Sequence, residues 1–295
     1  MTGRALSEVG RLTAVLVKHA REAFVSQDVI NAQWRSLNFA APPDFSRALA
    51  ESERFLEILA LERASLVFLA ADSSVTIDSI YARDASIVSP RGAIMCRMGK
   101  PARAPEPAAQ ERALIQCAGL AIGGRIADPG LLEGGDVVWL DSRTVAVGQG
   151  YRTNASGIQQ LRGLLNGAID DLVVVPLPHW RGPGDVMHLM SLISPVDTKL
   201  AVVYSRLLPA PFREELLERD FRLVEVPDEE FDTMGTNVLA LAPRVCVMVK
   251  GNPKTRAALE RAGATVYEYE GREISLKGGG GPTCLTRPLA RSPLT

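Results

Sequence analysis

Cysteine and histidine are scarce in this chain of 295 residues, which has four cysteines and three histidines. The cysteines are too few and too scattered for a disulfide framework, and no two of them have the CxxC spacing of a zinc site. We therefore expect no metal ion and no cofactor. Cys96, Cys117 and Cys246 fit the usual place of an unpaired cysteine, which is the hydrophobic core.

An excess of positive charge and long hydrophobic runs are also missing. The 33 Lys and Arg residues nearly balance the 34 Asp and Glu residues, which argues against a protein that grips nucleic acid by charge. No apolar run approaches the roughly 20 residues that span a bilayer, and the N-terminus lacks the apolar core of a signal peptide. We expect a cytoplasmic protein that binds neither nucleic acid nor membrane, and the composition leaves open a homo-oligomer.

The sequence does have enough hydrophobic residues to form a core, and it contains an internal repeat. Hydrophobic residues make up 46% of the chain, which favours a folded α/β protein over a disordered one. Residues 133–177 show a strand, a turn, a second strand, a helix that begins after Asn154, and a third strand. The same order recurs in residues 188–227 and 236–270, and its first part appears in residues 81–120.

One polar residue stands near the first strand of each unit, and these residues are separated by 49, 55, 48 and 48 positions: Asp84, Glu133, His188, Thr236 and Cys284. The strand at 284–290 has no helix after it, whereas residues 13–71 offer a strand, a helix and a strand. The two chain ends are therefore expected to complete one shared unit, so that residues 1–295 form a single domain. Five units would close into a ring without free sheet edges; an open α/β sheet is the alternative.

The glycine run at 278–281 leads directly to Cys284. Four glycines and a proline suit neither a strand nor a helix interior, but they fit a loop whose backbone passes close to a ligand. A cysteine at the end of such a loop can act as a nucleophile when its thiolate form is favoured. A small core residue is the alternative.

His188 follows a loop rich in glycine and proline and falls in the register of the repeat. A histidine at that position can serve as an acid and a base near neutral pH. A structural histidine is the alternative, and His179 is only nine residues upstream, so the repeat register is what favours His188.

Several carboxylates are expected near the same axis. Glu133 and Asp136 flank two glycines, and Asp78 and Asp84 lie in the preceding unit. Such acids could bind a metal ion, orient a histidine or hold a cationic ligand. Because only one histidine accompanies them, we favour a cationic ligand, and a guanidinium group fits paired carboxylates well.

Two arginines are candidates for the other end of a substrate. Arg152, in GYRTN, ends the second strand of its unit, and Arg103, in KPARAPEP, is a weaker candidate of the same kind. Either could bind a carboxylate, and a surface arginine is the alternative.

Together these residues resemble the guanidino-group-modifying enzymes of the pentein superfamily, which includes dimethylarginine dimethylaminohydrolase, arginine deiminase and the amidinotransferases. The resemblance rests on an ordered set of motifs: DSIYARD (78–84), LEGGD (132–136), GYRTN (150–154), HLMS (188–191) and GGGGPTC (278–284). It implies a five-bladed α/β propeller of ββαβ units, in agreement with the repeat. It also implies a lid formed by INAQWRSLNFA (30–40).

The resemblance further implies roles for the candidate residues. Cys284 would be the nucleophile, His188 the general acid and base, and Glu133 its acidic partner. The other candidates match residues that bind substrate. Asp78 and Asp84, with Asp136 from the acid motif, would bind the guanidinium group. Arg152 and Arg103 would bind a carboxylate of the substrate.

The implied activity is hydrolysis of arginine or an N-substituted arginine to citrulline and an amine. Arginine deiminases resemble this pattern but have an acid where this chain has Met190. A methionine there would pack against alkyl groups, which favours an N-substituted arginine such as dimethylarginine. Arg83 departs from the dimethylarginine enzymes and moderates this preference.

Three other functions remain open. An amidinotransferase, or an arginine dihydrolase that continues to ornithine, would use the same cysteine, histidine and glutamate. A binding protein is the alternative from a different class, because a ribosome-associated factor shares the fold without the catalytic residues. The presence together of Cys284, His188 and Glu133 favours an enzyme.

Overall fold

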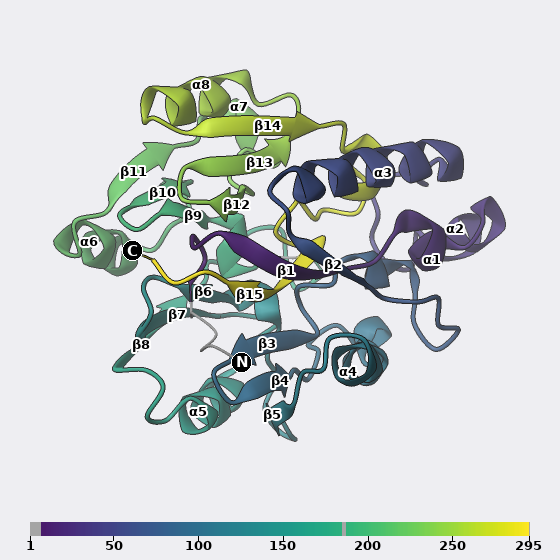
Figure 1. Ribbon diagram of the computed structural model, residues 1–295, viewed down its shortest axis with the longest axis horizontal. Helices are drawn as coiled ribbons and strands as arrows, with labels where there is room; N and C mark the ends of the chain where they lie inside the picture. Colours follow the sequence, from purple (N-terminus) through teal and green to yellow (C-terminus); the bar gives the residue numbers. More distant parts are fainter. Residues whose placement is uncertain (1–6, 185–186, 295) are drawn as a thin grey trace.

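Five small sheets arranged around a common centre make up the fold (Figure 1). The computed structural model describes residues 7–184 and 187–294. In each sheet the middle strand pairs antiparallel with one neighbour and parallel with the other. A parallel neighbour requires a crossover, and each crossover here contains a helix. The unit is therefore ββαβ, and the chain is the five-bladed α/β propeller that the sequence predicts.

Four of the sheets are built from consecutive segments. They consist of β3 (Ser86–Ser89), β4 (Gly92–Met95), α4 (Glu106–Gln116) and β5 (Ile122–Arg125); β6 (Val137–Trp139), β7 (Thr144–Gln149), α5 (Ala155–Leu164) and β8 (Asp171–Pro176); β9 (Ile193–Asp197), β10 (Leu200–Val203), α6 (Ala210–Glu218) and β11 (Arg222–Glu225); and β12 (Leu239–Ala242), β13 (Val245–Val249), α8 (Pro253–Arg261) and β14 (Thr265–Tyr269).

The two ends of the chain form the fifth sheet. Its strand order is β15–β1–β2, where β15 is Thr286–Arg291, β1 is Leu12–Val17 and β2 is Ser65–Phe68. The helix α3 (Phe45–Leu61) lies in the crossover between β1 and β2. In Figure 1, β15 and β1 run side by side although they come from opposite ends of the sequence.

Hydrophobic clusters between neighbouring sheets close the ring. The described residues form five such clusters, and each draws its side chains mainly from two adjacent sheets. Strand β1 supplies two of them, since alternate side chains of a strand point to opposite faces. Val15 and Val17 pack toward the sheet of β12–β14, whereas Leu16 packs toward the sheet of β3–β5. The shared sheet therefore has a neighbour on both sides.

Local sequence signals account for several helix boundaries. Asn154 caps α5, because its side-chain oxygen accepts a hydrogen bond of 2.8 Å from the Gly157 amide. Pro253 occupies the first turn of α8, where its missing amide proton costs little. Gly263 follows the end of that helix with φ of +88°, a conformation that glycine adopts without strain.

Other features were not predicted from the sequence. They are three short helices, α1 (Ala20–Phe24), α2 (Gln27–Gln33) and α7 (Asp228–Phe231), and the helical turns η1 (Ile77–Ile80), η2 (Pro101–Arg103), η3 (Gly134–Asp136), η4 (Leu189–Ser191) and η5 (Arg272–Leu276). Cys96 and Cys246 are buried as expected, but the expectation for Cys117 was wrong: it is exposed where α4 ends.

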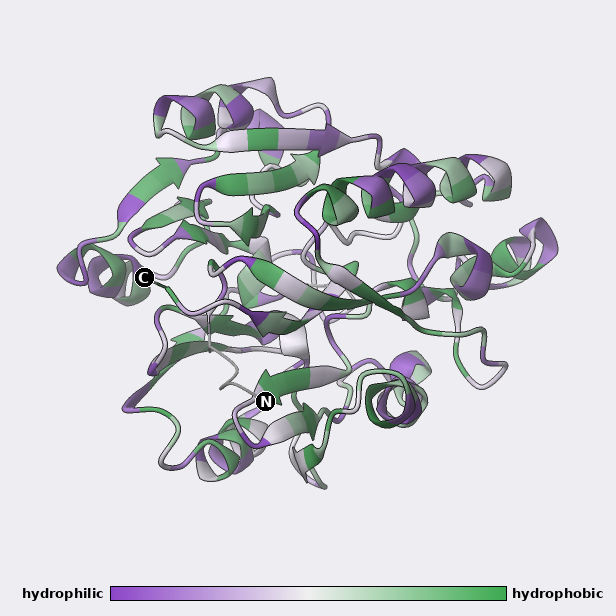
Figure 2. Cartoon of the chain, in the orientation of Figure 1, coloured by the Kyte–Doolittle hydropathy of each residue, from purple (hydrophilic) through white to green (hydrophobic). Residues whose placement is uncertain are grey.

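Hydrophobic residues concentrate on the strands, and polar residues on the outer helices (Figure 2). Over the described part of the chain, every helix is too short or too polar to cross a bilayer.

Replacing Leu16 tests the closure of the ring. Leu16 is fully buried between two sheets, so Leu16→Ala should lower the free energy of unfolding by about 2–5 kcal/mol. Urea unfolding followed by circular dichroism measures the change. Leu217→Ala, at a side chain on α6 that is 46% exposed, is the control and should change stability by less than about 0.5 kcal/mol. Equal effects for the two variants would contradict the packing described here.

Candidate active site

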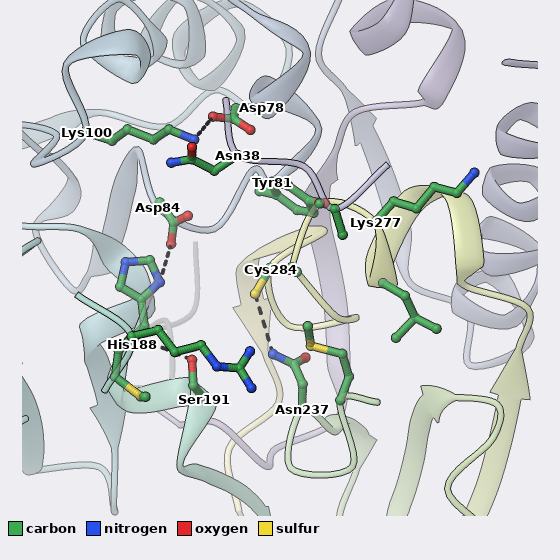
Figure 3. A pocket seen from close by; sticks show the side chains of 18 of the residues that line it. Asn38, Asp78, Tyr81, Asp84, Lys100, His188, Ser191, Asn237, Lys277 and Cys284 are labelled. Atoms are coloured by element: carbon green, nitrogen blue, oxygen red, sulfur yellow. Dashed lines mark hydrogen bonds and ion pairs between the residues drawn. The ribbon is translucent and has the colours of Figure 1, made fainter. Parts of the chain in front are cut away.

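A cavity of about 400 Å³ lies at the centre of the ring, within the size range of small-molecule sites. Loops attached to all five sheets line it. Six of the residues singled out in the sequence are in its wall: Asp78, Asp84, Arg103, Arg152, His188 and Cys284. Figure 3 shows Cys284 and His188 on the wall of the same space.

Cys284 ends a loop that packs closely against its protein neighbours. A Cβ atom on Gly278 or Gly280 would collide with Tyr81, and one on Gly281 would lie 2.5 Å from the Asn237 side-chain oxygen. The glycines are thus required by close contact with the protein itself, in addition to their place beside the cavity. The loop can therefore hold Cys284 in one position.

Asn237 fixes the nucleophile candidate from the side. Its amide nitrogen lies 3.5 Å from the Cys284 sulfur (Figure 3). Its carbonyl oxygen accepts hydrogen bonds from the Thr283 amide at 3.0 Å and the Thr283 hydroxyl at 2.9 Å. One side chain therefore orients both the backbone before the cysteine and the sulfur atom.

His188 stands at the start of the turn η4, held by side chains on either side. The Ser191 hydroxyl accepts a hydrogen bond from the His188 amide at 3.3 Å. A carboxylate oxygen of Asp136 accepts from the Leu189 amide at 3.0 Å. These contacts anchor the backbone that carries the imidazole.

Two carboxylates face the two nitrogens of the His188 ring. Nε2 lies 2.8 Å from Glu133, and Nδ1 lies 3.8 Å from Asp84. Burial by itself would lower the pKa of His188, but the negative charges of Asp84, Asp136 and Glu133 outweigh it and raise that pKa to about 9. The imidazole is consequently protonated at neutral pH.

Glu133 lies behind His188 and is completely buried. Burial raises its pKa, but the hydrogen bond to His188 and the nearby positive charges lower it to about 2. Backbone amides of Gly99 and Lys100 donate to its other oxygen at 2.9 and 3.0 Å. Arg152 adds an ion pair at 3.3 Å. The carboxylate therefore stays ionised and keeps the imidazole charged.

Asp84 is held by an arginine that is itself fully bonded. Arg103 donates to Asp84 at 2.5 Å, to Glu106 at 2.8 and 2.9 Å, and to the Tyr81 carbonyl at 2.8 Å. Burial raises the pKa of Glu106 to about 7 although Arg103 opposes this shift. Since each nitrogen of Arg103 already has a partner, its contacts favour a role in positioning Asp84 over binding a substrate carboxylate.

Asp78 faces the cavity with Lys100 as its partner. The Lys100 nitrogen lies 2.6 Å from the Asp78 carboxylate and 2.7 Å from the Leu37 carbonyl. Leu37, Asn38 and Ala40 belong to the stretch expected to form a lid, and all three line the cavity. This stretch thus contributes directly to the cavity wall.

Asp84, Glu133 and His188 bring three potential metal ligands within 4.8 Å of one another. Their oxygens already accept hydrogen bonds from cations and amides, as described above. These ion pairs and hydrogen bonds account for the cluster without a metal ion. The expectation that the protein has no metal site stays a prediction.

A family model agrees with this arrangement. The model described as "N,N dimethylarginine dimethylhydrolase, eukaryotic" matches residues 22–291. The chain belongs to this family.

Curated relatives extend the comparison. The chain is 28% identical over 242 residues to the uncharacterized protein YkgA of Bacillus subtilis (strain 168), covering 82% of this chain and 79% of that protein. It is 33% identical over 198 residues to the arginine deiminase of Mycobacterium tuberculosis (strain ATCC 25618 / H37Rv), covering 55% of this chain and 47% of that enzyme. The chain thus matches less than half the length of the deiminase.

Solved structures share the fold. The dimethylarginine dimethylaminohydrolase of Pseudomonas aeruginosa, a cysteine-to-serine mutant complexed with citrulline, superposes with a TM-score of 0.74 at 22% identity, covering 96% of this chain and all of that one. An amidinotransferase of Microseira wollei, SxtG, gives 0.76 at 16% identity, covering 99% and 98%. Family and relatives together identify a guanidino-modifying enzyme of the pentein superfamily.

The structure places two of the residues singled out in the sequence away from the cavity wall. Asp136 is fully buried and does not line the cavity, and its carboxylate accepts a hydrogen bond from the Leu189 amide, so its contacts favour positioning of that backbone over binding of substrate. Met190 packs in the hydrophobic core between two sheets and likewise does not line the cavity. It therefore cannot select for alkyl groups on the substrate, and the preference drawn from it loses its support.

Sequence reasoning missed Asn237, Tyr81, Lys100 and Lys277, all of which line the cavity. A signal existed for Asn237, because it directly follows Thr236, the polar residue at the repeat position of its unit. The lysines gave no signal, since neither stands in a repeat position and single lysines are common on protein surfaces.

Titration of the thiol tests the environment of Cys284. Burial raises the pKa of Cys284, an effect that the hydrogen bonds from Thr283 and Asn237 only partly offset. The free enzyme should therefore carry a neutral thiol at pH 7 and form thiolate only above the ordinary cysteine pKa of about 8.5. The measurement is the absorbance difference at the thiolate band between wild type and Cys284→Ala. A thiolate already present at pH 7 would show that the site stabilises the anion.

Glu133→Gln tests the ion pair with His188. The substitution removes a negative charge from the imidazolium, so the pKa of His188 should fall from about 9 toward its ordinary value. A pH titration of the His188 ring protons by NMR measures it. Glu270→Gln, at a largely exposed side chain paired with Lys250, is the matched control and should leave that pKa unchanged. An unchanged pKa in Glu133→Gln would remove Glu133 from this role.

Proposed function

We propose that this protein hydrolyses the guanidinium group of arginine or an N-substituted arginine, releasing citrulline and an amine. The observation that carries the proposal is the grouping of Cys284 and the His188–Glu133 pair at one cavity. Relatives whose names refer to arginine or dimethylarginine hydrolysis support it.

The charges of the cavity suit an amino acid with a cationic side chain. Asp78 and Asp84 offer negative charge to a guanidinium group, and Arg152, which lines the same cavity, offers positive charge to a substrate carboxylate. A cavity of about 400 Å³ can enclose a molecule of that size. Such a mixed lining favours a zwitterionic substrate over a simple amine.

In the first step, the Cys284 thiolate attacks the central carbon of the guanidinium group. Because burial disfavours the thiolate in the free enzyme, the positive charge of a bound guanidinium is what makes ionisation of the thiol favourable. The thiol proton passes to solvent as the substrate binds, because the His188 imidazole is already protonated. The attack forms a carbon–sulfur bond, and the departing nitrogen takes a proton from the His188 imidazolium as the carbon–nitrogen bond breaks.

In the second step, the neutral His188 imidazole accepts a proton from water. The hydroxide adds to the same carbon, the carbon–sulfur bond breaks, and a ureido group is released as citrulline. The departing sulfur takes the proton of the added hydroxyl group, which returns Cys284 to the neutral thiol, and Glu133 stabilises the imidazolium that forms again. Water is consumed and one amine is produced in each turnover.

Substituting the nucleophile tests the proposal. Cys284→Ala should lower turnover at least about a thousandfold while it preserves the fold and the binding of a guanidino ligand. The assay mixes protein with arginine, monomethylarginine or dimethylarginine and measures citrulline, ornithine, ammonia and methylamines. Cys117→Ala, at an exposed cysteine outside the cavity, should retain full activity.

The products distinguish the remaining alternatives. Ornithine would indicate an arginine dihydrolase, and transfer to an added amine would indicate an amidinotransferase. Full activity of Cys284→Ala would reject the nucleophile. Failure of wild type to convert any guanidino compound would reject the proposed function.

A further inference from the structure

Three arginine side chains are buried together outside the substrate cavity. Arg83, Arg287 and Arg291 are only 1%, 5% and 4% exposed, and none of them lines the cavity that holds Cys284. Arg287 and Arg291 lie on β15, the strand that closes the ring (Figure 1). Buried charges of one sign are costly unless an opposite charge accompanies them.

Among the described residues, 7–184 and 187–294, one carboxylate forms an ion pair with this arginine cluster. Glu8 lies 3.2 Å from Arg83 and is itself buried. Asp84 also acts on Arg287 electrostatically, but its oxygens are bonded to Arg103 and to the Gly135 amide. Three guanidinium groups therefore share a single available carboxylate.

Several guanidinium nitrogens in the cluster find no acceptor in the part of the chain that the structure describes. Among residues 7–184 and 187–294, the ε nitrogens of Arg287 and Arg291 and the Nη2 atom of Arg291 are buried without a hydrogen-bond partner. The neighbouring nitrogens do have partners, since Arg291 donates to the carbonyls of Gly10 at 2.6 Å and Ala240 at 2.8 Å, and Arg287 donates to the Arg83 carbonyl. The side chains are thus held in place with donors left unused.

A small cavity of about 30 Å³ lies among these side chains, lined by Glu8 and the three arginines. That space exceeds the roughly 10–15 Å³ that one water molecule needs, but it is too small for an organic substrate or a nucleotide. We propose that it binds a small monovalent inorganic anion of the chloride type, which supplies the missing negative charge and accepts the unused N–H groups.

Loss of protons from the arginines would also relieve the excess positive charge of the cluster, but it is a weaker explanation. Burial lowers the pKa of Arg287 to about 9 and of Arg291 to about 10, with the charge of Arg83 contributing to both shifts. Both values stay above neutral pH, so the guanidinium groups remain charged. Water could accept the free N–H groups, but it would leave the excess positive charge uncompensated.

The anion site adjoins the backbone of the nucleophile loop. The Arg83 amide donates to the Cys284 carbonyl at 3.1 Å, and its ε nitrogen donates to the Thr283 carbonyl at 3.2 Å. An anion that offsets the mutual repulsion of the arginines would hold Arg83 in place, and with it the loop. The site is therefore a structural support beneath Cys284, separate from substrate binding.

Thermal unfolding in different salts tests the site. The wild-type protein is heated in sodium chloride or in sodium gluconate of the same ionic strength, because gluconate is too large for the cavity. With a dissociation constant of about 1 mM, raising chloride from about 1 to 100 mM should raise Tm by about 5 °C relative to gluconate. Arg291→Met should abolish this difference, and Arg213→Met, at a half-exposed arginine on α6, should retain it. Identical Tm values in the two salts would overturn the proposal.

Crystallography with bromide gives an answer even if Arg291→Met does not fold. Wild-type crystals containing about 10 mM bromide, about ten times the dissociation constant assumed above, should show an anomalous peak between Arg287 and Arg291. Ordinary water density there, without an anomalous signal, would overturn the proposal. The proposed hydrolase activity would be unaffected by that result, because it depends on the separate cavity.

Discussion

The antiparallel pairing of β15 with β1 is the interaction on which the site depends, because it joins the two ends of the chain in one sheet. Cys284 lies two residues before β15, so this pairing places the sulfur beside the segments that carry Asp84 and His188. Without it, the ring would expose unpaired sheet edges and the cavity would lose the wall that holds Cys284. Fold stability and catalytic geometry are thus linked through one strand pair.

Buried charge is balanced in two different ways around the Cys284 loop. On the side of the cavity, each acid has a nearby cation: Glu133 holds His188 and Arg152, and Asp84 holds Arg103. These pairs keep the imidazole protonated, whereas burial keeps the Cys284 thiol neutral. On the other side, positive charge exceeds the available carboxylate, which is the imbalance that an anion would remove. The Cys284 loop therefore lies between the cavity, for which we propose a cationic ligand, and the buried arginine cluster, for which we propose an anion.

The repeat was predictable because each unit must bury its own strands and helix, which imposes a regular hydrophobic pattern on the sequence. The direction of individual side chains was not predictable in the same way. Met190 and Asp136 lie in the motifs of His188 and Glu133, but they stand in the short turns η4 and η3, where neighbouring residues point in different directions. The register singled out Thr236, which lines the cavity, but it gave no sign that the next residue, Asn237, contacts the Cys284 sulfur.

The central claim is that a sulfur atom at the centre of the ring becomes bonded to the guanidinium carbon. Mass spectrometry of the protein, quenched with acid during turnover of arginine or a methylated arginine and then digested, tests it most directly. The account predicts an adduct on the peptide that contains Cys284, with the mass of the substrate less the departing amine. Product formation with no adduct on that peptide, or with an adduct on another cysteine, would contradict it.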